Sequence, residues 1–234
     1  MDEGLPAAVR EAAADRRGGA TEVAARALDG LLEVAGDRRR LEAAVAALLA
    51  GQPAMAPVWH LARAARGPDP HAALSRLRDR LAADADAAVD AAAAWLRPRL
   101  AGGGGAAVAT VSHSSLVDRV LARLPPAAAH PGPGSGEARP ALGPGPGAAP
   151  PVVGLVGADA IGPEALLNAA GTGELAARLP TLVVATSIKL LPAEAFARLA
   201  GPGFEAVPLR AVAAVVVGPA VLSPAEAARL AAIS

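Results

Sequence analysis

Two short runs rich in valine give the clearest hydrophobic pattern in the chain. Val152–Val156 and Leu182–Ala185 are too brief for helices and predict buried strands of a parallel sheet. Between them, Gly171 and Thr172 precede good helix formers, and Thr172 is a residue type that caps helices. Strand, helix and strand in this order predict one right-handed βαβ unit. Asp159 follows shortly after the first strand, where open α/β sheets bind their ligands.

The first hundred residues instead carry apolar positions at the spacing of three and four that is typical of helices. Thr21 is placed to cap one helix, Gly51 to end another, and Pro57 to occupy the first turn of a third. A longer helix is expected over residues 71–100. We therefore predict an N-terminal helical domain at residues 1–101.

Residues 106–234 predict an α/β domain of the Rossmann type. Two further short runs predict strands: Val108–Val111 and Val212–Val217. Ser115 and Asp118 fit a capping box, and the free N–H groups at that helix start suit a phosphate. Ser223 and Glu226 predict a second capping box, at the start of the last helix.

Two stretches of small residues interrupt this pattern. Gly102–Gly105 precedes a predicted strand, whereas a phosphate-binding loop follows one, so we interpret it as a linker. Residues 125–150 hold 14 Pro or Gly among 26, a density that predicts a loop.

Composition excludes several classes of function. Acidic and basic residues balance at 22 each, so the chain lacks the positive field that holds nucleic acid. With no cysteine and four histidines that lack metal-ligand spacing, we expect no disulfide, metal or cofactor. No signal peptide is evident and no apolar run approaches the ~20 residues that cross a bilayer, so we expect a cytoplasmic protein without a membrane partner. Lys189 is the single lysine of an arginine-rich chain.

Three positions have two interpretations each. Asp159 is either an acid–base group with a pKa raised by its apolar surroundings, or an Asx-turn residue. Gly171 and Thr172 either hold a phosphate or form an ordinary helix cap. Lys189 either reaches a phosphate or lies at the surface after its strand.

Several motifs point to one family. The most specific is GADAI at residues 157–161, with Asn168, Gly171 and Thr172 spaced after it and a strand and lysine downstream. Other stretches agree: RRGGATEVAARAL, QPAMAPVWHLARA, VATVSHSSLV and FEAVPL with VLSPAEAARL. Together they resemble the alpha, beta and delta subunits of translation initiation factor 2B, which are related to methylthioribose-1-phosphate and ribose-1,5-bisphosphate isomerases. The resemblance implies a helical domain joined to a Rossmann-like domain, a homodimer or a related partner subunit, and a pocket for a phosphorylated sugar or nucleotide.

The chain also departs from the isomerases of this family. Ser114 stands where they carry a catalytic cysteine, and serine is a far poorer proton donor at neutral pH. Arg17 is similar to the arginine of their phosphate-binding R-G pair, whereas the lysine of their N-K-I-G-T motif is Ala169 here. Their E-[ST]-R-P segment survives only at residues 137–140, without the helix and strand that follow it. We therefore expect a sheet that is shorter by about one α/β repeat.

We interpret the sequence as an α/β protein of this type that binds a phosphorylated sugar or nucleotide, with a regulatory or translation-factor-like role and an incomplete isomerase site. The alternatives are a phosphosugar aldose-ketose isomerase, with Asp159 as its catalytic residue, and a ligand-free structural or regulatory subunit. The predicted ligand-binding residues are Ser114, Ser115, Asp159, Asn168, Gly171, Thr172, Lys189 and Arg17. All but Arg17 are expected to converge at the carboxyl edge of the sheet.

Overall fold

The computed structural model describes residues 4–101, 107–111, 114–125, 151–199 and 201–234. The helices are α1 (Ala7–Ala14), α2 (Ala20–Glu33), α3 (Arg38–Gly51), α4 (Ala56–Ala65), α5 (Pro70–Leu100), α6 (Ser115–Leu121), α7 (Thr172–Arg178), α8 (Ala193–Phe196) and α9 (Pro224–Ala232), with 3-10 helices η2 (Ser187–Lys189) and η3 (Leu209–Ala211). The strands are β1 (Ala107–Ala109), β2 (Pro151–Val156), β3 (Ala160–Ile161), β4 (Ala165–Ala169), β5 (Thr181–Ala185), β6 (Phe204–Pro208), β7 (Ala214–Val217) and β8 (Ala220–Leu222). The predicted α/β class, with helices first and a mostly parallel sheet after them, is confirmed.

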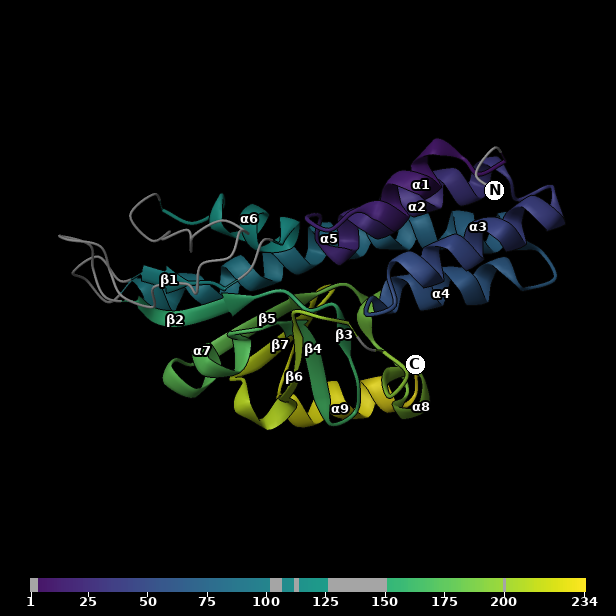
Figure 1. Ribbon diagram of the computed structural model, residues 1–234. Coiled ribbons are helices and arrows are strands. Elements are labelled where there is room, and N and C mark those ends of the chain that lie inside the picture. The colour runs from purple at the N-terminus through teal and green to yellow at the C-terminus, as the bar shows by residue number, and fades with distance from the viewer. Residues whose placement is uncertain (1–3, 102–106, 112–113, 126–150, 200) are drawn as a thin grey trace.

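The long helix α5 belongs to two hydrophobic cores. Its first half, with Leu74 and Leu81, packs among α1–α4. Its second half, from Ala85 to Leu96, packs on the parallel sheet together with α6. Figure 1 shows α5 running behind the other N-terminal helices and onward along β1 and β2. Because one helix serves both cores, the proposed division at residue 101 stays a prediction.

The main sheet has the strand order β1-β2-β5-β7-β8. The first four strands are parallel, and β8 pairs with β7 in antiparallel direction. The predicted parallel pairing of β2 with β5 is therefore confirmed, and valine and leucine fill β5 and β7 because both faces of these strands are covered.

The sequence does not predict the second sheet, of order β3-β4-β6, whose strands are antiparallel. Strands β3 and β4 lie in the connection from β2 to β5, and β6 lies in the connection from β5 to β7, so each of these connections is more than a single helix. The strand β4 has the sequence ALLNA, in which alanine and leucine favour helix. Pairing with β6 along all five residues of β4 overrides that local preference.

Three predicted helix caps are wrong by one or two residues. Thr172 and Ser115 are the first residues inside α7 and α6, and Thr21 lies inside α2. The N-cap of α7 is Gly171, whose φ of 99° a β-branched threonine adopts only with strain. The capping box of Ser223 with Glu226 at the start of α9 is confirmed.

Some expectations fall outside the described residues. These are the linker at residues 102–105, the loop at 125–150 apart from its first residue, and the shortening of the sheet by about one α/β repeat. In the described part of the chain, no helix is both long and apolar enough to cross a membrane. The cytoplasmic location stays a prediction.

A substitution at Gly51 tests how closely α1 and α3 approach each other. A Cβ at Gly51 would lie 2.3 Å from the carbonyl oxygen of Ala13 and 2.8 Å from its Cα. Since that neighbour is backbone, we expect Gly51→Ala to lower the free energy of unfolding by roughly 1–3 kcal/mol, measured by urea denaturation. The control is Gly36→Ala, because a Cβ there meets no atom within 4 Å. Equal stability of the two variants would contradict this packing.

Candidate functional site

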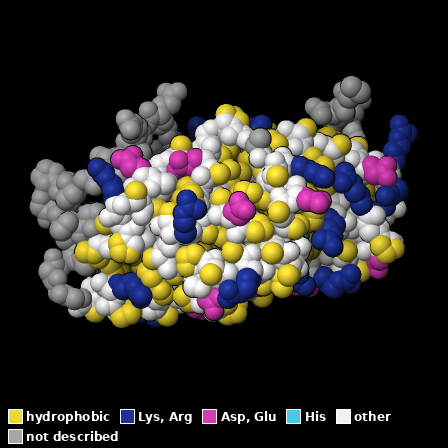
Figure 2. Space-filling view, turned by 90° about the horizontal axis from the view of Figure 1, so that it is seen from below, with side chains coloured by type: hydrophobic (Ala, Val, Ile, Leu, Met, Phe, Trp, Pro, Cys, Tyr) yellow, Lys and Arg dark blue, Asp and Glu magenta, His cyan; other side chains and the backbone are white. Residues whose placement is uncertain are grey.

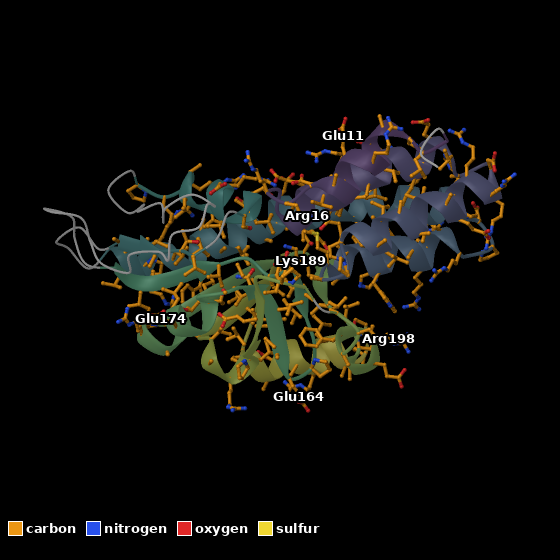
Figure 3. All side chains as sticks on the ribbon, viewed as in Figure 1. Glu11, Arg16, Glu164, Glu174, Lys189 and Arg198 are labelled. Carbon is orange, nitrogen blue, oxygen red and sulfur yellow. The ribbon has the colours of Figure 1, made fainter. Side chains whose placement is uncertain are left out.

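A cavity of about 310 Å³ lies between the helical half of the molecule and the carboxyl edge of the parallel sheet. The helical half contributes residues 15–20, Gln52 and Met55, and the α/β half contributes Ser114, residues 157–159, Asn168, Ala169, Lys189 and residues 202–204. In Figure 3, Arg16 and Lys189 mark this boundary between the N-terminal helices and the sheet. The cavity is therefore built by both halves of the chain.

The loop between α1 and α2 is held in shape by Asp15. One carboxylate oxygen accepts hydrogen bonds from the N–H groups of Arg17, at 2.8 Å, and Gly18, at 2.7 Å. The other oxygen forms an ion pair with Arg26 at 2.8 Å. The Gly18 and Arg17 bonds, followed by the Arg26 charge, hold the pKa of Asp15 below its usual value. The backbone of Arg17 is thereby fixed three residues before the start of α2.

Two longer connections hold the helical wall in place. The buried Gln52 donates from Nε2 to the carbonyl oxygens of Ala12, at 2.8 Å, and Asp15, at 2.6 Å. The N–H of Ala56, at the start of α4, donates to the carbonyl oxygen of Asp159 at 3.0 Å. The backbone of the loop after β2 is therefore bonded directly to the helical half.

Lys189 is the most unusual side chain of the cavity wall. It is 2% exposed, so the interpretation of a surface lysine is wrong. Within the described residues, its ammonium group forms no hydrogen bond and no ion pair. Burial lowers the pKa of Lys189, and the negative charge of Asp159 opposes that effect.

The pKa of Asp159 is also shifted by burial, toward the uncharged form. Burial raises the pKa of its carboxyl group to about 6, although the positive charge of Lys189 opposes the change. Within the described residues, the Asp159 side chain does not form the hydrogen bond that an Asx turn requires. The two groups thus affect each other electrostatically across the cavity without a direct bond.

Lys189 owes its position to a residue that sequence analysis missed. Asp84, on α5, accepts hydrogen bonds from the N–H of Ser187, at 3.0 Å, and from the Ser187 hydroxyl. Ser187 is the first residue of η2, and Lys189 is its last. The helix that joins the two cores therefore also fixes the short turn that directs Lys189.

Asn168 and Thr172 form a buried pair at the end of β4. The Asn168 amide donates from Nδ2 to the Thr172 hydroxyl at 2.9 Å, and that hydroxyl donates to the Ala169 carbonyl at 2.7 Å. Asn168 lines the cavity, whereas Thr172 lies behind it. Thr172 therefore orients the amide rather than facing the cavity.

The first turn of α7 is hydrogen-bonded to an acidic side chain of the protein itself. The N–H of Gly173 donates to the carboxylate of Glu205, on β6, at 2.8 Å. Gly171 and Thr172 are not part of the cavity wall. In this arrangement the position at which a phosphate was expected is occupied by the protein's own carboxylate.

Ser114 lies at the cavity and is 8% exposed. It is the N-cap residue of α6, but its hydroxyl makes no capping bond. A Cβ at Gly157 would lie 2.8 Å from the Ser114 hydroxyl oxygen, so the absence of a side chain at Gly157 permits this approach. Ser115 does not line the cavity.

Five of the eight predicted residues thus meet at one cavity: Arg17, Ser114, Asp159, Asn168 and Lys189. The other three, Ser115, Gly171 and Thr172, lie outside its wall.

Asp15 carries the Asx-turn signature of an aspartate with a glycine three residues later, which the sequence analysis overlooked. Gln52, Asp84 and Glu205 show no local signal, because their partners lie 32 to 103 positions away. No three acidic or histidine side chains in the described ranges are placed to hold a metal ion.

The architecture defines a class of two-part α/β proteins, in which an N-terminal helical half covers the carboxyl edge of a Rossmann-like sheet. Three solved structures share it. The translation initiation factor eIF-2B of Pyrococcus horikoshii OT3 is 16% identical with a TM-score of 0.66, covering 93% of this chain and 96% of that chain. The tetrameric eIF2B-beta2-delta2 complex of C. thermophilum is 17% identical with a TM-score of 0.61, covering 93% and 90%. The 5-methylthioribose 1-phosphate isomerase of Pyrococcus horikoshii OT3 is 13% identical with a TM-score of 0.55, covering 97% and 87%.

The predicted resemblance to initiation factor 2B subunits and their isomerase relatives is therefore confirmed at the level of the fold. No family model and no curated protein sequence matches the chain. Identities of 13–17% do not carry over an activity or a ligand.

The raised pKa of Asp159 predicts how stability depends on pH. Between about pH 4 and 6 the folded protein retains a proton that the unfolded chain releases, so wild-type stability falls as pH rises through this range. Asp159→Asn removes the ionisation. A pKa raised from 3.8 to about 6 corresponds to about 3 kcal/mol, so at pH 7.5 the variant should be more stable by up to that amount. Below pH 4 the difference should vanish.

Urea denaturation of both proteins from pH 3.5 to 7.5 measures this difference. Glu164→Gln is the control, because that carboxylate is exposed and distant from the cavity. A variant at Asp159 that is less stable than the wild type at pH 7.5 would show that the carboxylate is stabilised rather than strained by its surroundings.

Proposed function

We propose that the cavity binds a phosphorylated small molecule, a sugar or a nucleotide, and that the protein acts as a regulatory or translation-factor-like subunit with an incomplete isomerase site. The observation that carries this proposal is Lys189, a buried lysine that faces a cavity without an ion-pair partner among the described residues. Burying an unpaired ammonium costs several kcal/mol, which a bound anion would offset. The volume of about 310 Å³ suits a small ligand.

The opposite wall supports a second contact with the anion. Arg17 precedes α2, a helix of 14 residues whose first turn carries N–H groups without intrahelical acceptors. The N–H of Gly19 donates to the Glu22 carboxylate at 3.2 Å and the N–H of Glu22 donates to the Gly19 carbonyl, so the amides of Ala20 and Thr21 are left for a ligand. A phosphate between Arg17 and Lys189 would be held by charge from both halves of the protein.

The remaining polar groups suit the sugar portion of such a ligand. Asn168, oriented by Thr172, offers amide atoms to hydroxyl groups, and the free hydroxyl of Ser114 faces the same space. Solved structures with this fold include subunits of eIF2B and a 5-methylthioribose 1-phosphate isomerase, which supports a role in one of these two classes.

The alternative function is aldose-ketose isomerisation of a phosphosugar, favoured by the pKa of Asp159. A carboxyl group with a pKa of about 6 suits proton transfer at neutral pH. However, the expected cysteine is Ser114, whose hydroxyl is a weak acid. Conversion of methylthioribose 1-phosphate or ribose 1,5-bisphosphate to the ketose by the wild type, abolished in Asp159→Asn, would establish the isomerase in place of the proposed binding role.

Lys189→Met tests the binding proposal directly. Loss of a charge-assisted hydrogen bond of about 1.5–3 kcal/mol should weaken binding by roughly tenfold or more. Because the variant also removes an unpaired buried charge, its free energy of unfolding should not decrease. Calorimetric titration with ribose 5-phosphate, methylthioribose 1-phosphate and AMP measures the affinity, and denaturation measures the stability.

Arg178→Met is the matched control, because Arg178 is paired with Glu174 at 3.5 Å on α7 and lies outside the cavity. The control should bind the ligand as the wild type does. If none of these compounds binds the wild type, the protein is better described as the ligand-free structural subunit.

The expected homodimer, or pairing with a related subunit, belongs to this proposal. One solved structure of the same fold is a tetrameric eIF2B complex. Val221, on the edge strand β8, is 45% exposed and suits an interface. Light scattering should give a mass above the 22.9 kDa of one chain, and a monomer at every concentration would exclude the homodimer.

A further inference from the structure

A second hollow lies on the helical half, separate from the central cavity. It is a groove of about 220 Å³ between α4 and α5. Its wall consists of His60, Arg63, Ala64, Ala73, Arg76, Leu77 and Arg80. None of these residues lines the central cavity, so the groove is a distinct site.

Three arginines line this groove without acidic partners. Arg63 belongs to α4, and Arg76 and Arg80 lie one turn apart on α5. In the described part of the chain, none of the three forms an ion pair. Arg63 is held over the ring of Trp59, with 5.6 Å between its guanidinium carbon and the ring centre. Figure 2 shows Lys and Arg side chains grouped toward the end of the molecule where the helical half lies.

The carboxylates closest in sequence have other partners. Asp69 accepts the N–H of Ala72, Asp79 faces Arg78 at 3.9 Å, and Asp84 accepts both bonds from Ser187. The full chain has a net charge of zero, so this cluster is a local excess of positive charge.

We propose that this groove is a binding site for a compact anion of the diphosphate class. Arg76 and Arg80 are about 6 Å apart along the helix axis, measured on the backbone, so they are neighbours on one face of α5. Together with Arg63 they bring three positive charges to the groove, which suits a diphosphate better than a single monophosphate. Arg63 approaches from the opposite wall, and planar guanidinium groups bind phosphate oxygens in pairs. The anion is either free diphosphate or the diphosphate of a nucleotide.

The groove is connected to the central cavity through His60. The Nε2 of His60 hydrogen-bonds the carbonyl oxygen of Leu190 at 2.8 Å, and Leu190 directly follows Lys189. Burial lowers the pKa of His60, the Leu190 bond opposes this, and the charges of Arg63 and Arg80 lower the pKa further. An anion in the groove would therefore act on a ring that contacts the segment carrying Lys189.

Calorimetric titration of the full chain with sodium diphosphate tests the proposal, at an ionic strength held constant with sodium chloride. We expect saturable binding to the wild type and a loss of at least tenfold in affinity in Arg76→Gln/Arg80→Gln. The matched control is Arg39→Gln/Arg97→Gln, which removes the same charge from exposed helical positions outside the groove. Its affinity should equal that of the wild type.

Two further titrations identify which anion binds and separate this site from the central cavity. ADP binding with the same dependence on Arg76 and Arg80 would indicate a nucleotide, whereas a response to diphosphate alone would indicate the free anion. Lys189→Met should bind diphosphate as the wild type does, so failure of the cavity proposal leaves this one standing. Absence of saturable binding to the wild type, or equal loss in both double variants, would overturn the groove site.

Discussion

The packing of α5 is the constraint on which the rest of the structure depends. Leu74 and Leu81 belong to the helical core, whereas the second half of the helix, including Ala88 and Ala92, belongs to the core on the parallel sheet. Alanine at these positions allows the helix backbone to approach the strands closely. Only 2% of the residues are aromatic, so such close approach replaces large side chains as the source of buried area. This one helix therefore packs against both halves of the molecule that enclose the central cavity.

The cavity brings two electrostatically unfavourable groups together. Burial favours the uncharged form of both Asp159 and Lys189, and their mutual attraction compensates each only in part. A site with this character is costly to the folded protein and is favourable to a charged ligand. The bond that Ser187 donates to Asp84 and the bond that Ala56 donates to the Asp159 carbonyl hold the backbone near the two charged groups in place, which limits their relaxation toward solvent.

Much of the fold follows from local sequence patterns. The valine-rich runs at β2 and β5, the helical periodicity before residue 101 and the Ser223 capping box all carry their signals within a few residues. The second sheet carries no such signal, because the alanines and leucines of Ala165–Ala169 favour helix and the segment becomes a strand through pairing with β6. For the candidate site, Asp159 and Lys189 stand out by position and by rarity, whereas the burial of Lys189 depends on contacts across the whole chain.

The backbone bond between Ala56 and Asp159 has a consequence for the dynamics of the cavity. This bond of 3.0 Å crosses from the helical half to the loop that carries the perturbed carboxylate. Any hinge motion that separates the two halves at this point must break it, and the Ala56 amide then exchanges its hydrogen with solvent. The exchange rate of that single amide therefore reports how often the cavity opens, independently of any assumption about what enters it.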